Sequence, residues 1–331
     1  MPVLLSEKDV RAVLSMDDLI ESMHAALVQF SSGKVQQPLR TVIGVEANAR
    51  SGKGGFYGVM PAFLPQPAAL GTKLVTVYES NAARGLPTHL ATIVLLDPET
   101  GELLAILDGR YITEARTAAV SAVSAKHLAR PDAGVLAIVG SGVQARSHIE
   151  ALIRVQRFEE IRVWGRDPAR LFSLVEEMLP RVGTRLVPVE SVREAVRDAG
   201  IVALVTAARE PVVERVWIAP GAHICAVGAC RPDQREMDTS LVRDARVFVD
   251  SRVGALAEAG DLVIPIKEGA FAASHIVAEL GEVLGGRVQG RRSADEITIF
   301  KSLGMAVEDV AAARLAWERA SERGFGRGFV L

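Results

Sequence analysis

The sequence predicts an α/β protein with a doubly wound parallel sheet and a second, mixed α+β domain. After residue 112, short apolar runs alternate with amphipathic helical stretches, which is typical of a parallel sheet covered by helices on both faces. Before that point, the runs are richer in β-branched residues and alternate in polarity, as strands with one buried face do. The length of 331 residues suggests two domains, and 49% apolar residues allow a sizeable core.

Residues 6–33 are expected to be helical. Apolar side chains recur at helical spacing between residues 19 and 30, and the Ser-Ser-Gly sequence at 31–33 ends the pattern. Ser15, with Asp18 three residues later, is typical of a capping box at a helix start.

Residues 40–110 are expected to form β-structure. Residues 73–78 read as a strand, with Lys73, Val75 and Val77 on one face and the other three residues on the opposite face. Two further apolar runs, 89–97 and 103–108, flank the sequence Pro-Glu-Thr-Gly, whose turn-forming residues predict a hairpin.

The remainder of the chain is expected to carry the parallel sheet. An alanine-rich helix is predicted at 118–128, further helical stretches include 168–178, and a last helix at 302–323 is expected to pack on the N-terminal domain. The short apolar runs that predict buried parallel strands are 134–139, 161–164, 186–189, 201–205, 223–227 and 247–249.

Charge and cysteine content exclude several classes of function. A formal net charge of −2 provides no positive field for a nucleic-acid backbone, so no nucleic-acid partner is expected. The two cysteines, Cys225 and Cys230, lack partners at zinc spacing, which predicts packed, reduced thiols and no metal. We see no apolar run of membrane-spanning length and no signal peptide, so a cytoplasmic location without a membrane partner is expected.

The clearest motif is the sequence Gly-Ser-Gly-Val-Gln-Ala at residues 140–145, directly after an apolar run. Gly140 permits a tight turn, Gly142 lets the backbone approach a phosphate, and the small Ala145 allows close helix–strand packing. The helical stretch 143–155 would present unpaired N–H groups and the positive end of its dipole. The motif therefore favours a Rossmann domain that binds a dinucleotide over a purely structural turn.

A second cofactor signal follows the next strand, at Arg166 and Asp167, where a Rossmann domain meets the adenosine ribose. An acidic residue there favours NAD because it binds the 2′-hydroxyl, whereas an arginine favours NADP because it binds the 2′-phosphate. Arg166 comes first and favours NADPH, while Asp167 keeps NADH open. The alternative is that both residues are solvated and that Asp167 caps the next helix.

Three cations are candidates for binding an anionic substrate, namely Arg40, Lys73 and Arg116. Lys73 shares a predicted strand face with two valines, and burial of an ammonium is costly unless it is paired. A solvated surface position is the alternative for each cation. Among the histidines, His89 is the best candidate because it begins a strand near these residues, although packing is the commoner role.

Several segments of the sequence are specific in pattern and occur in a fixed order, namely 58–62, 72–76, 87–89, 113–121, 140–145, 226–233 and 300–309. Together they make the sequence similar to the ornithine cyclodeaminase/mu-crystallin family over nearly its whole length. The resemblance implies a homodimer in which residues 1–112 with 306–331 form the substrate-binding and dimerisation domain. Residues 113–305 would form the Rossmann domain.

The resemblance, together with the patterns above, provides the candidate site residues. Lys73 and Arg116 are expected to be catalytic. The expected substrate-binding residues are Arg40, Lys73, His89, Arg116, Cys230, Leu303 and Gly304. The expected cofactor-binding residues are Thr117, Gly140, Gly142, Val143, Gln144, Arg166, Thr206, Val227 and Ser302.

One departure from the family pattern separates its activities. Ornithine cyclodeaminases and archaeal-type alanine dehydrogenases carry an aspartate at the position of Cys230, and in the cyclodeaminases this carboxylate engages the substrate amine. A thiol cannot anchor an ammonium in this way, and the ketimine-reducing members have a small serine there. Arg166 is also not preceded by the aspartate that cyclodeaminases use for NAD, because Gly165 stands in that place.

The resemblance therefore implies a reductase that uses NADPH, with NADH possible. Its substrate would be a cyclic ketimine carboxylate, 1-pyrroline-2-carboxylate or 1-piperideine-2-carboxylate, and its product L-proline or L-pipecolate. Arg116 with Arg40 would clamp the carboxylate in bidentate fashion, and Lys73 would donate or relay a proton. The alternatives are ornithine cyclodeaminase or alanine dehydrogenase-type activity, and a non-catalytic protein that binds NADPH or thyroid hormone.

Overall fold

The computed structural model describes residues 1–47 and 54–330, and its chain divides into two compact units. The first unit comprises Met1–Arg116 and Met305–Leu331, and the second comprises Thr117–Gly304. The first division falls after Arg116, inside one continuous helix that also includes residue 112. The predicted β region 40–110 includes residues 48–53, which lie outside the described residues.

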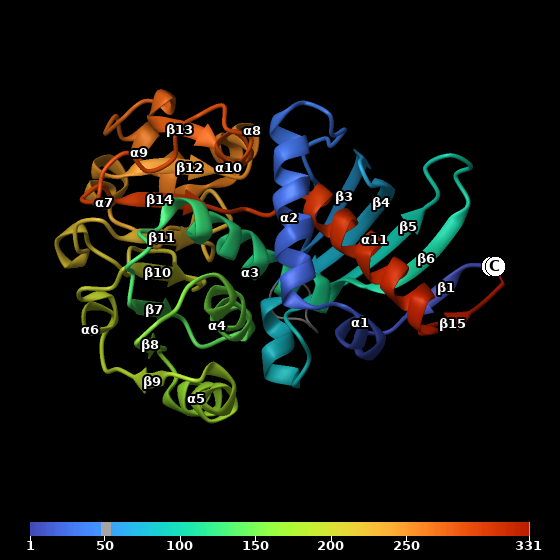
Figure 1. Ribbon diagram of the computed structural model, residues 1–331, viewed down its shortest axis with the longest axis horizontal. Coiled ribbons are helices and arrows are strands. Elements are labelled where there is room, and N and C mark those ends of the chain that lie inside the picture. The colour runs from blue at the N-terminus through green and yellow to red at the C-terminus, as the bar shows by residue number, and fades with distance from the viewer. Residues whose placement is uncertain (48–53, 331) are drawn as a thin grey trace. The chain divides into compact units, whose positions relative to one another are not determined.

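The first unit is a seven-stranded sheet with helices on it (Figure 1). The strand order is β15-β1-β6-β5-β4-β3-β2, and all neighbours are antiparallel except β1 and β6. The predicted hairpin of β5 and β6 is confirmed. Its elements are β1 (Val3–Leu5), α1 (Glu7–Val13), α2 (Met16–Ser31), β2 (Thr41–Val45), β3 (Gly55–Pro65), β4 (Ala68–Val77), a 3-10 helix (Glu79–Arg84), β5 (His89–Leu96), β6 (Leu103–Asp108), α11 (Ala306–Arg323) and β15 (Arg327–Gly328).

The predicted N-terminal helical region is two helices, because a second cap interrupts it. The side chain of Ser15 accepts a hydrogen bond from the Asp18 N–H at 3.1 Å and begins α2. The reciprocal contact of a full capping box occurs one helix earlier, between Ser6 and Asp9. The prediction at Ser15 is therefore confirmed for the cap and wrong for the box.

Helix α11 packs against α2, β3 and β4 and completes the core of the first unit (Figure 1). The predicted return of the last helix to the N-terminal domain is thus confirmed. The predicted start at residue 302 is wrong, because a buried strand at 298–301 precedes the helix, which begins at Ala306.

On β4, alternate residues from Ala69 to Val75 are buried, so Lys73 lies on the buried face.

The second unit is an eight-stranded parallel sheet with apolar side chains packed on both faces. The doubly wound sheet that the sequence predicts is therefore confirmed. Its strand order is β13-β12-β14-β11-β10-β7-β8-β9. Its strands are β7 (Val135–Val139), β8 (Glu160–Trp164), β9 (Arg185–Pro188), β10 (Ile201–Leu204), β11 (His223–Ala226), β12 (Arg246–Val249), β13 (Ile276–Glu279) and β14 (Thr298–Lys301). Its helices are α4 (Val143–Val155), α5 (Pro168–Val182), α6 (Val192–Val196), α7 (Thr239–Asp244), α8 (Arg252–Glu258), α9 (Gly260–Lys267) and α10 (Leu280–Leu284), with 3-10 turns at Arg215–Trp217 and Ala273–His275.

The strand order reverses between β7 and β10, because the chain proceeds to β8 and β9 on one side of β7 and to β10 and β11 on the other. Open α/β sheets bind ligands at the carboxyl ends of the strands beside such a reversal.

Helix α3 (Gly109–Leu128), predicted to begin at Ala118, begins at Gly109 instead. Its first turns are more polar than the alanine-rich part, so the alanine pattern marks only its second half. Among the described residues, no helix combines the length and the hydropathy that crossing a bilayer requires.

Candidate functional site

The glycine-rich turn between β7 and α4 adopts the geometry that a phosphate-binding loop needs. Gly140 has a φ of +133°, and a Cβ there would lie 2.7 Å from the carbonyl oxygen of Val205, so only glycine fits. A Cβ on Gly142 would meet nothing within 4 Å, which leaves the approach to the start of α4 open. Helix α4 begins at Val143, where its first N–H groups lack intrahelical partners.

Two polar side-chain atoms among the expected cofactor residues fit a bound nucleotide. Gln144 Oε1 and Ser302 Oγ are buried and have no hydrogen-bond partner within the described part of the chain. Gln144 lies in the first turn of α4, and Ser302 follows β14. Buried polar atoms normally have partners, so these orphaned atoms, together with the open space at Gly142, fit a polar ligand at the carboxyl edge of the sheet.

Arg166 and Asp167, which follow β8 after Gly165, have separate roles. The Asp167 side chain accepts hydrogen bonds from the N–H groups of Ala169 at 3.0 Å and Arg170 at 3.3 Å, and so caps α5. Arg166 is exposed in the turn before this cap. The alternative interpretation of Asp167 as a helix cap is therefore confirmed, and Arg166 is the side chain of the pair that this cap does not engage.

Most of the expected cofactor residues follow strands of the parallel sheet. Thr206 follows β10, and Val227 follows β11. Thr117 is the exception, since it is buried on α3. The ends of β7, β8, β10, β11 and β14 thus bring together residues that are far apart in the sequence, as expected for a dinucleotide site at the reversal of strand order.

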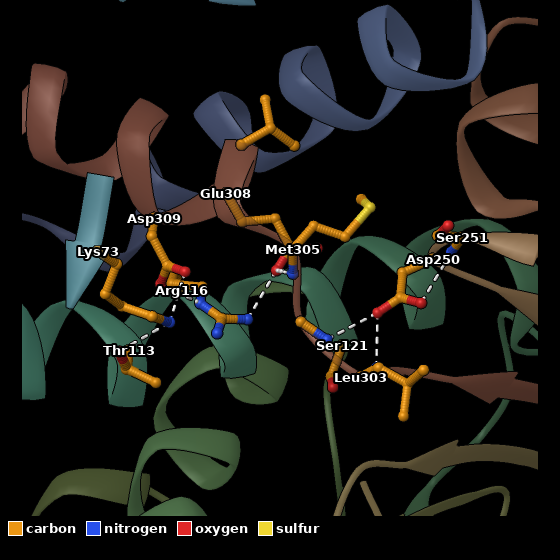
Figure 2. Close-up of polar contacts among 12 residues, drawn as sticks. Lys73, Thr113, Arg116, Ser121, Asp250, Ser251, Leu303, Met305, Glu308 and Asp309 are labelled. Carbon is orange, nitrogen blue, oxygen red and sulfur yellow. Dashed lines mark hydrogen bonds and ion pairs between the residues drawn. The ribbon is translucent and has the colours of Figure 1, made fainter. Parts of the chain in front are cut away.

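In the first unit, Lys73 and Arg116 converge on two carboxylates of α11 (Figure 2). Lys73 Nζ lies 2.5 Å from Asp309 Oδ2, and Arg116 Nε lies 2.9 Å from Asp309 Oδ1. Arg116 Nη1 donates to Glu308 Oε2 at 2.6 Å. Lys73 is 2% exposed, Arg116 is 4% exposed and both carboxylates are fully buried. Both acids lie in the first turn of α11, where the helix dipole favours negative charge.

Burial and neighbouring charges shift the titration of this cluster. Burial lowers the pKa of Lys73 to about 8; Asp309 opposes the shift, and Arg116 and Arg40 add to it. Burial, with Lys73 next in importance, lowers the pKa of His89 to about 4, so this imidazole is neutral at pH 7. The pKa of Asp309 is lowered, because Arg116 and Lys73 together outweigh the opposing effect of burial.

The expected substrate residues of the first unit thus act on one another electrostatically. Three cations (Arg40, Lys73 and Arg116) against two carboxylates (Glu308 and Asp309) leave 3 − 2 = +1. The expected bidentate clamp is modified, because a substrate carboxylate would share the Arg116 guanidinium with both acids. These two acids were not predicted from the sequence, although a Glu-Asp pair at the start of a helix is a visible signal.

Two of the expected substrate residues of the second unit, Leu303 and Gly304, are held by a third carboxylate that was not predicted from the sequence. Asp250, fully buried between the end of β12 and the start of α8, accepts a hydrogen bond from the N–H group of Leu303 at 2.6 Å (Figure 2). It also accepts one from the N–H group of Gly304 at 2.8 Å. Gly304 has a φ of +80°, which favours glycine. Asp250 therefore fixes the backbone at the turn after β14.

The two cysteines differ, which corrects the expectation that both are packed. Cys225 is buried on β11, and burial raises the pKa of its thiol to about 12. Cys230 is exposed, because it lies in the loop after β11 and not in the strand. Within the described ranges, no group of three or more His, Cys, Asp or Glu side chains is arranged to hold a metal ion.

Comparison with known proteins identifies the family. Residues 1–324 match the ornithine cyclodeaminase/mu-crystallin family. The chain belongs to this family. It is 44% identical over 323 residues to the ketimine reductase mu-crystallin of Mus musculus, covering 96% of this chain and 97% of the relative.

Two solved structures place this family member among nucleotide-binding relatives. One is the Delta(1)-pyrroline-2-carboxylate reductase of Thermococcus litoralis in complex with NADH and L-proline, with a TM-score of 0.94, 42% identity, and coverage of 99% of this chain and 100% of that one. The other is an archaeal alanine dehydrogenase dimer with bound NAD, with a TM-score of 0.92, 31% identity and coverage of 99% of both chains. The expected family and α/β fold class are confirmed.

Proposed function

We propose that this protein reduces cyclic ketimine carboxylates, such as 1-pyrroline-2-carboxylate or 1-piperideine-2-carboxylate, to L-proline or L-pipecolate with a nicotinamide dinucleotide. The observation that carries the proposal is the buried cluster of Lys73, Arg116 and Asp309, in a chain that also carries an open phosphate-binding turn. The Thermococcus relative, which holds NADH and L-proline, supports both halves of the proposal.

The first unit would bind the substrate through charge. The surplus of one positive charge among Arg40, Lys73, Arg116 and their two acids suits a single carboxylate. Arg116 is held on two sides by Asp309 and Glu308, so its guanidinium plane is already oriented when a carboxylate arrives. Such preorganisation reduces the cost of ordering side chains on binding.

Lys73 would supply the proton that the reduction needs. When bound, NAD(P)H supplies the hydride that adds to the carbon of the C=N bond. The imine nitrogen then carries one proton more than in the neutral imine, and Lys73 Nζ is the donor we assign. With its pKa lowered to about 8 by burial, Lys73 is mostly protonated at pH 7 and still a much better acid than an exposed lysine. Asp309 holds this ammonium in place at 2.5 Å.

We propose NADPH as the preferred cofactor, with NADH also accepted. Arg166 is exposed beyond β8, at the position where a Rossmann domain meets the adenosine ribose. Asp167 is engaged with the N–H groups of α5 and so offers the 2′-hydroxyl less than an uncommitted carboxylate would. A guanidinium at this place favours a 2′-phosphate.

A substrate panel tests the proposed function. Purified protein is assayed with NADPH and with NADH against 1-pyrroline-2-carboxylate and 1-piperideine-2-carboxylate, and separately against ornithine and against pyruvate with ammonia. We expect turnover of the cyclic imines, with a higher kcat/KM for NADPH. Because exposed Cys230 stands where cyclodeaminases carry an aspartate, we expect no ornithine turnover. Nucleotide binding without turnover of any imine would instead indicate a non-catalytic binding protein.

We also propose that the protein is a homodimer that pairs through the edge strand β2. This strand lies at one end of the sheet, and its side chains are exposed, including Val42 at 52% and Ile43 at 54%. An exposed apolar edge strand invites pairing with another chain, and a two-fold dimer can pair the same patch with itself. The alanine dehydrogenase relative is a dimer.

Charge on the β2 edge is expected to break this dimer. We expect the wild type to sediment as a dimer and the double variant Val42→Lys with Ile43→Lys to sediment as a monomer. Val216→Lys is the matched control, because Val216 is an apolar residue that is 82% exposed in the other unit. Sedimentation velocity that finds a wild-type monomer, or an intact dimer in the double variant, would contradict the proposal.

A further inference from the structure

Glu236 is a buried carboxylate that accepts four hydrogen bonds from the protein. Its Oε1 accepts hydrogen bonds from Thr206 N at 2.7 Å and Thr206 Oγ1 at 2.8 Å. Its Oε2 accepts from Gly228 N at 2.8 Å and Ala229 N at 3.1 Å. The side chain is fully buried, so both carboxylate oxygens are satisfied by the protein.

These four bonds join the ends of two neighbouring strands. Thr206 follows β10, and Gly228 and Ala229 follow β11, which pairs with β10 in parallel. The two loops approach so closely that a Cβ on Gly228 would lie 1.9 Å from the carbonyl oxygen of Thr206 and 2.6 Å from Glu236 Oε1. Glu236 therefore serves as the common acceptor of two loops, although the N–H group of Gly228 also donates to the carbonyl oxygen of Leu204 at 3.1 Å.

The four hydrogen bonds to Glu236, which we call the Glu236 clamp, are supported by a buried ion pair between Asp261 and Lys301. Asp261 on α9 accepts hydrogen bonds from Glu236 N at 2.8 Å and Met237 N at 3.1 Å. Its other oxygen accepts from Lys301 Nζ, at the end of β14, at 3.0 Å. Burial raises the pKa of Glu236 to about 6, while Lys301 and the Thr206 donors oppose the shift. The network thus links the ends of β10, β11 and β14.

The topology says which half of a dinucleotide these loops would meet. The pyrophosphate belongs at the turn after β7, and the adenosine ribose belongs at the end of β8, near Arg166. A dinucleotide lies across the reversal of strand order, so its other half lies on the β10 side. The loops at Thr206 and Gly228 are on that side of β7.

We propose that Glu236 is a positioning residue for the nicotinamide half of the cofactor, because it holds the loops after β10 and β11 in one fixed arrangement. The inference rests on the proposed use of a nicotinamide dinucleotide. It concerns residues on the β10 side of β7, outside the Lys73–Arg116 cluster.

The variant Glu236→Gln tests the clamp. The amide keeps one acceptor oxygen, but its NH2 group faces two donors, so two of the four hydrogen bonds are replaced by donor–donor contacts. We expect NADPH affinity, measured by the change in its fluorescence, to fall about 10-fold or more, because hydrogen bonds to charged groups are lost. Affinity for 2′-phospho-ADP-ribose, which lacks nicotinamide, should stay within about twofold in competition binding. Amide hydrogen exchange should accelerate at Thr206, Gly228 and Ala229.

The control variant is expected to weaken the binding of both probes, not of NADPH alone. Arg166→Ala should weaken NADPH and 2′-phospho-ADP-ribose equally, since both carry the 2′-phosphate. If Glu236→Gln does not fold, Thr206→Val and Thr206→Ser test the same clamp, because only the serine keeps the hydroxyl donor to Glu236. We expect the valine variant alone to lose NADPH affinity while it retains 2′-phospho-ADP-ribose.

The outcomes separate this inference from the proposed function. A wild type that binds NADPH and reduces 1-pyrroline-2-carboxylate, with a Glu236→Gln variant that binds both probes as the wild type does, overturns only the role of Glu236. Equal weakening of both probes in the folded variant also overturns it, because the effect would then be general. A wild type that binds no nucleotide overturns both.

Discussion

Replacing Lys73 with methionine is expected to lower kcat/KM for cyclic ketimines by about 100-fold or more, the usual range for loss of a general acid. Nucleotide binding should persist, since the phosphate-binding turn belongs to the other unit. Methionine matches the length of the lysine stem, and Asp309 keeps its contact with Arg116 at 2.9 Å. Steady-state kinetics and NADPH fluorescence titration measure the two effects.

The control for this variant is Lys126→Met, which removes an exposed lysine from α3. It should retain wild-type turnover. Ketimine reduction by Lys73→Met at the wild-type rate would remove Lys73 from the mechanism. Because the variant removes one partner of a buried ion pair, we expect the free energy of unfolding to fall, but by less than in Arg116→Met, since Asp309 keeps its hydrogen bond from Arg116.

The pH dependence of the wild type should report the same lysine. Because burial lowers the pKa of Lys73 to about 8, the ammonium is lost as the pH rises through that value, well below the ordinary range for lysine. If the protonated form donates the proton, kcat/KM should fall tenfold per pH unit above about pH 8. This descending limb should be absent from the residual activity of Lys73→Met. His89 is already neutral above its pKa of about 4 and should not contribute near neutral pH.

Replacing Arg116 with methionine should have the largest effect on stability. The guanidinium contacts Asp309 and Glu308, both fully buried, so its loss removes a cationic partner from each of these carboxylates. Removing one partner of a buried ion pair typically costs about 3–5 kcal/mol in the free energy of unfolding. Urea denaturation at pH 7 measures this change, and ketimine turnover should be lost as well.

Acidification should partly reverse the defect of this variant. In the wild type, Arg116 is the main influence that opposes burial and lowers the pKa of Asp309, so its removal raises that pKa. The difference in unfolding free energy between wild type and variant should therefore shrink as the pH falls and the carboxylates are neutralised. The matched variant Arg116→Lys keeps the charge and should lose less stability. An Arg116→Met variant as stable as the wild type at pH 7 would contradict the role of this ion pair.

Local patterns along the sequence were sufficient to predict the parallel sheet and its phosphate-binding turn. Buried parallel strands are short and wholly apolar, and the order strand, glycine turn, helix is local, so neither requires knowledge of distant contacts. The start of α4 at Val143 and the glycine geometry at Gly140 follow from residues within a few positions of each other. An ammonium on an apolar strand face likewise marked Lys73.

Only the tertiary structure decided which charges neutralise the candidate residues. Asp309 lies 193 positions from Arg116, and Glu236 lies 30 positions from Thr206, so no local spacing connects them. Their partnership arises because α11 returns to the sheet of the first unit and because parallel strands bring their carboxyl ends to one edge. The exposure of Cys230 and the start of α3 at Gly109 were likewise not predicted from local patterns. The sequence determines which residues carry chemistry, whereas burial and pairing, which depend on the whole fold, decide their charge and orientation.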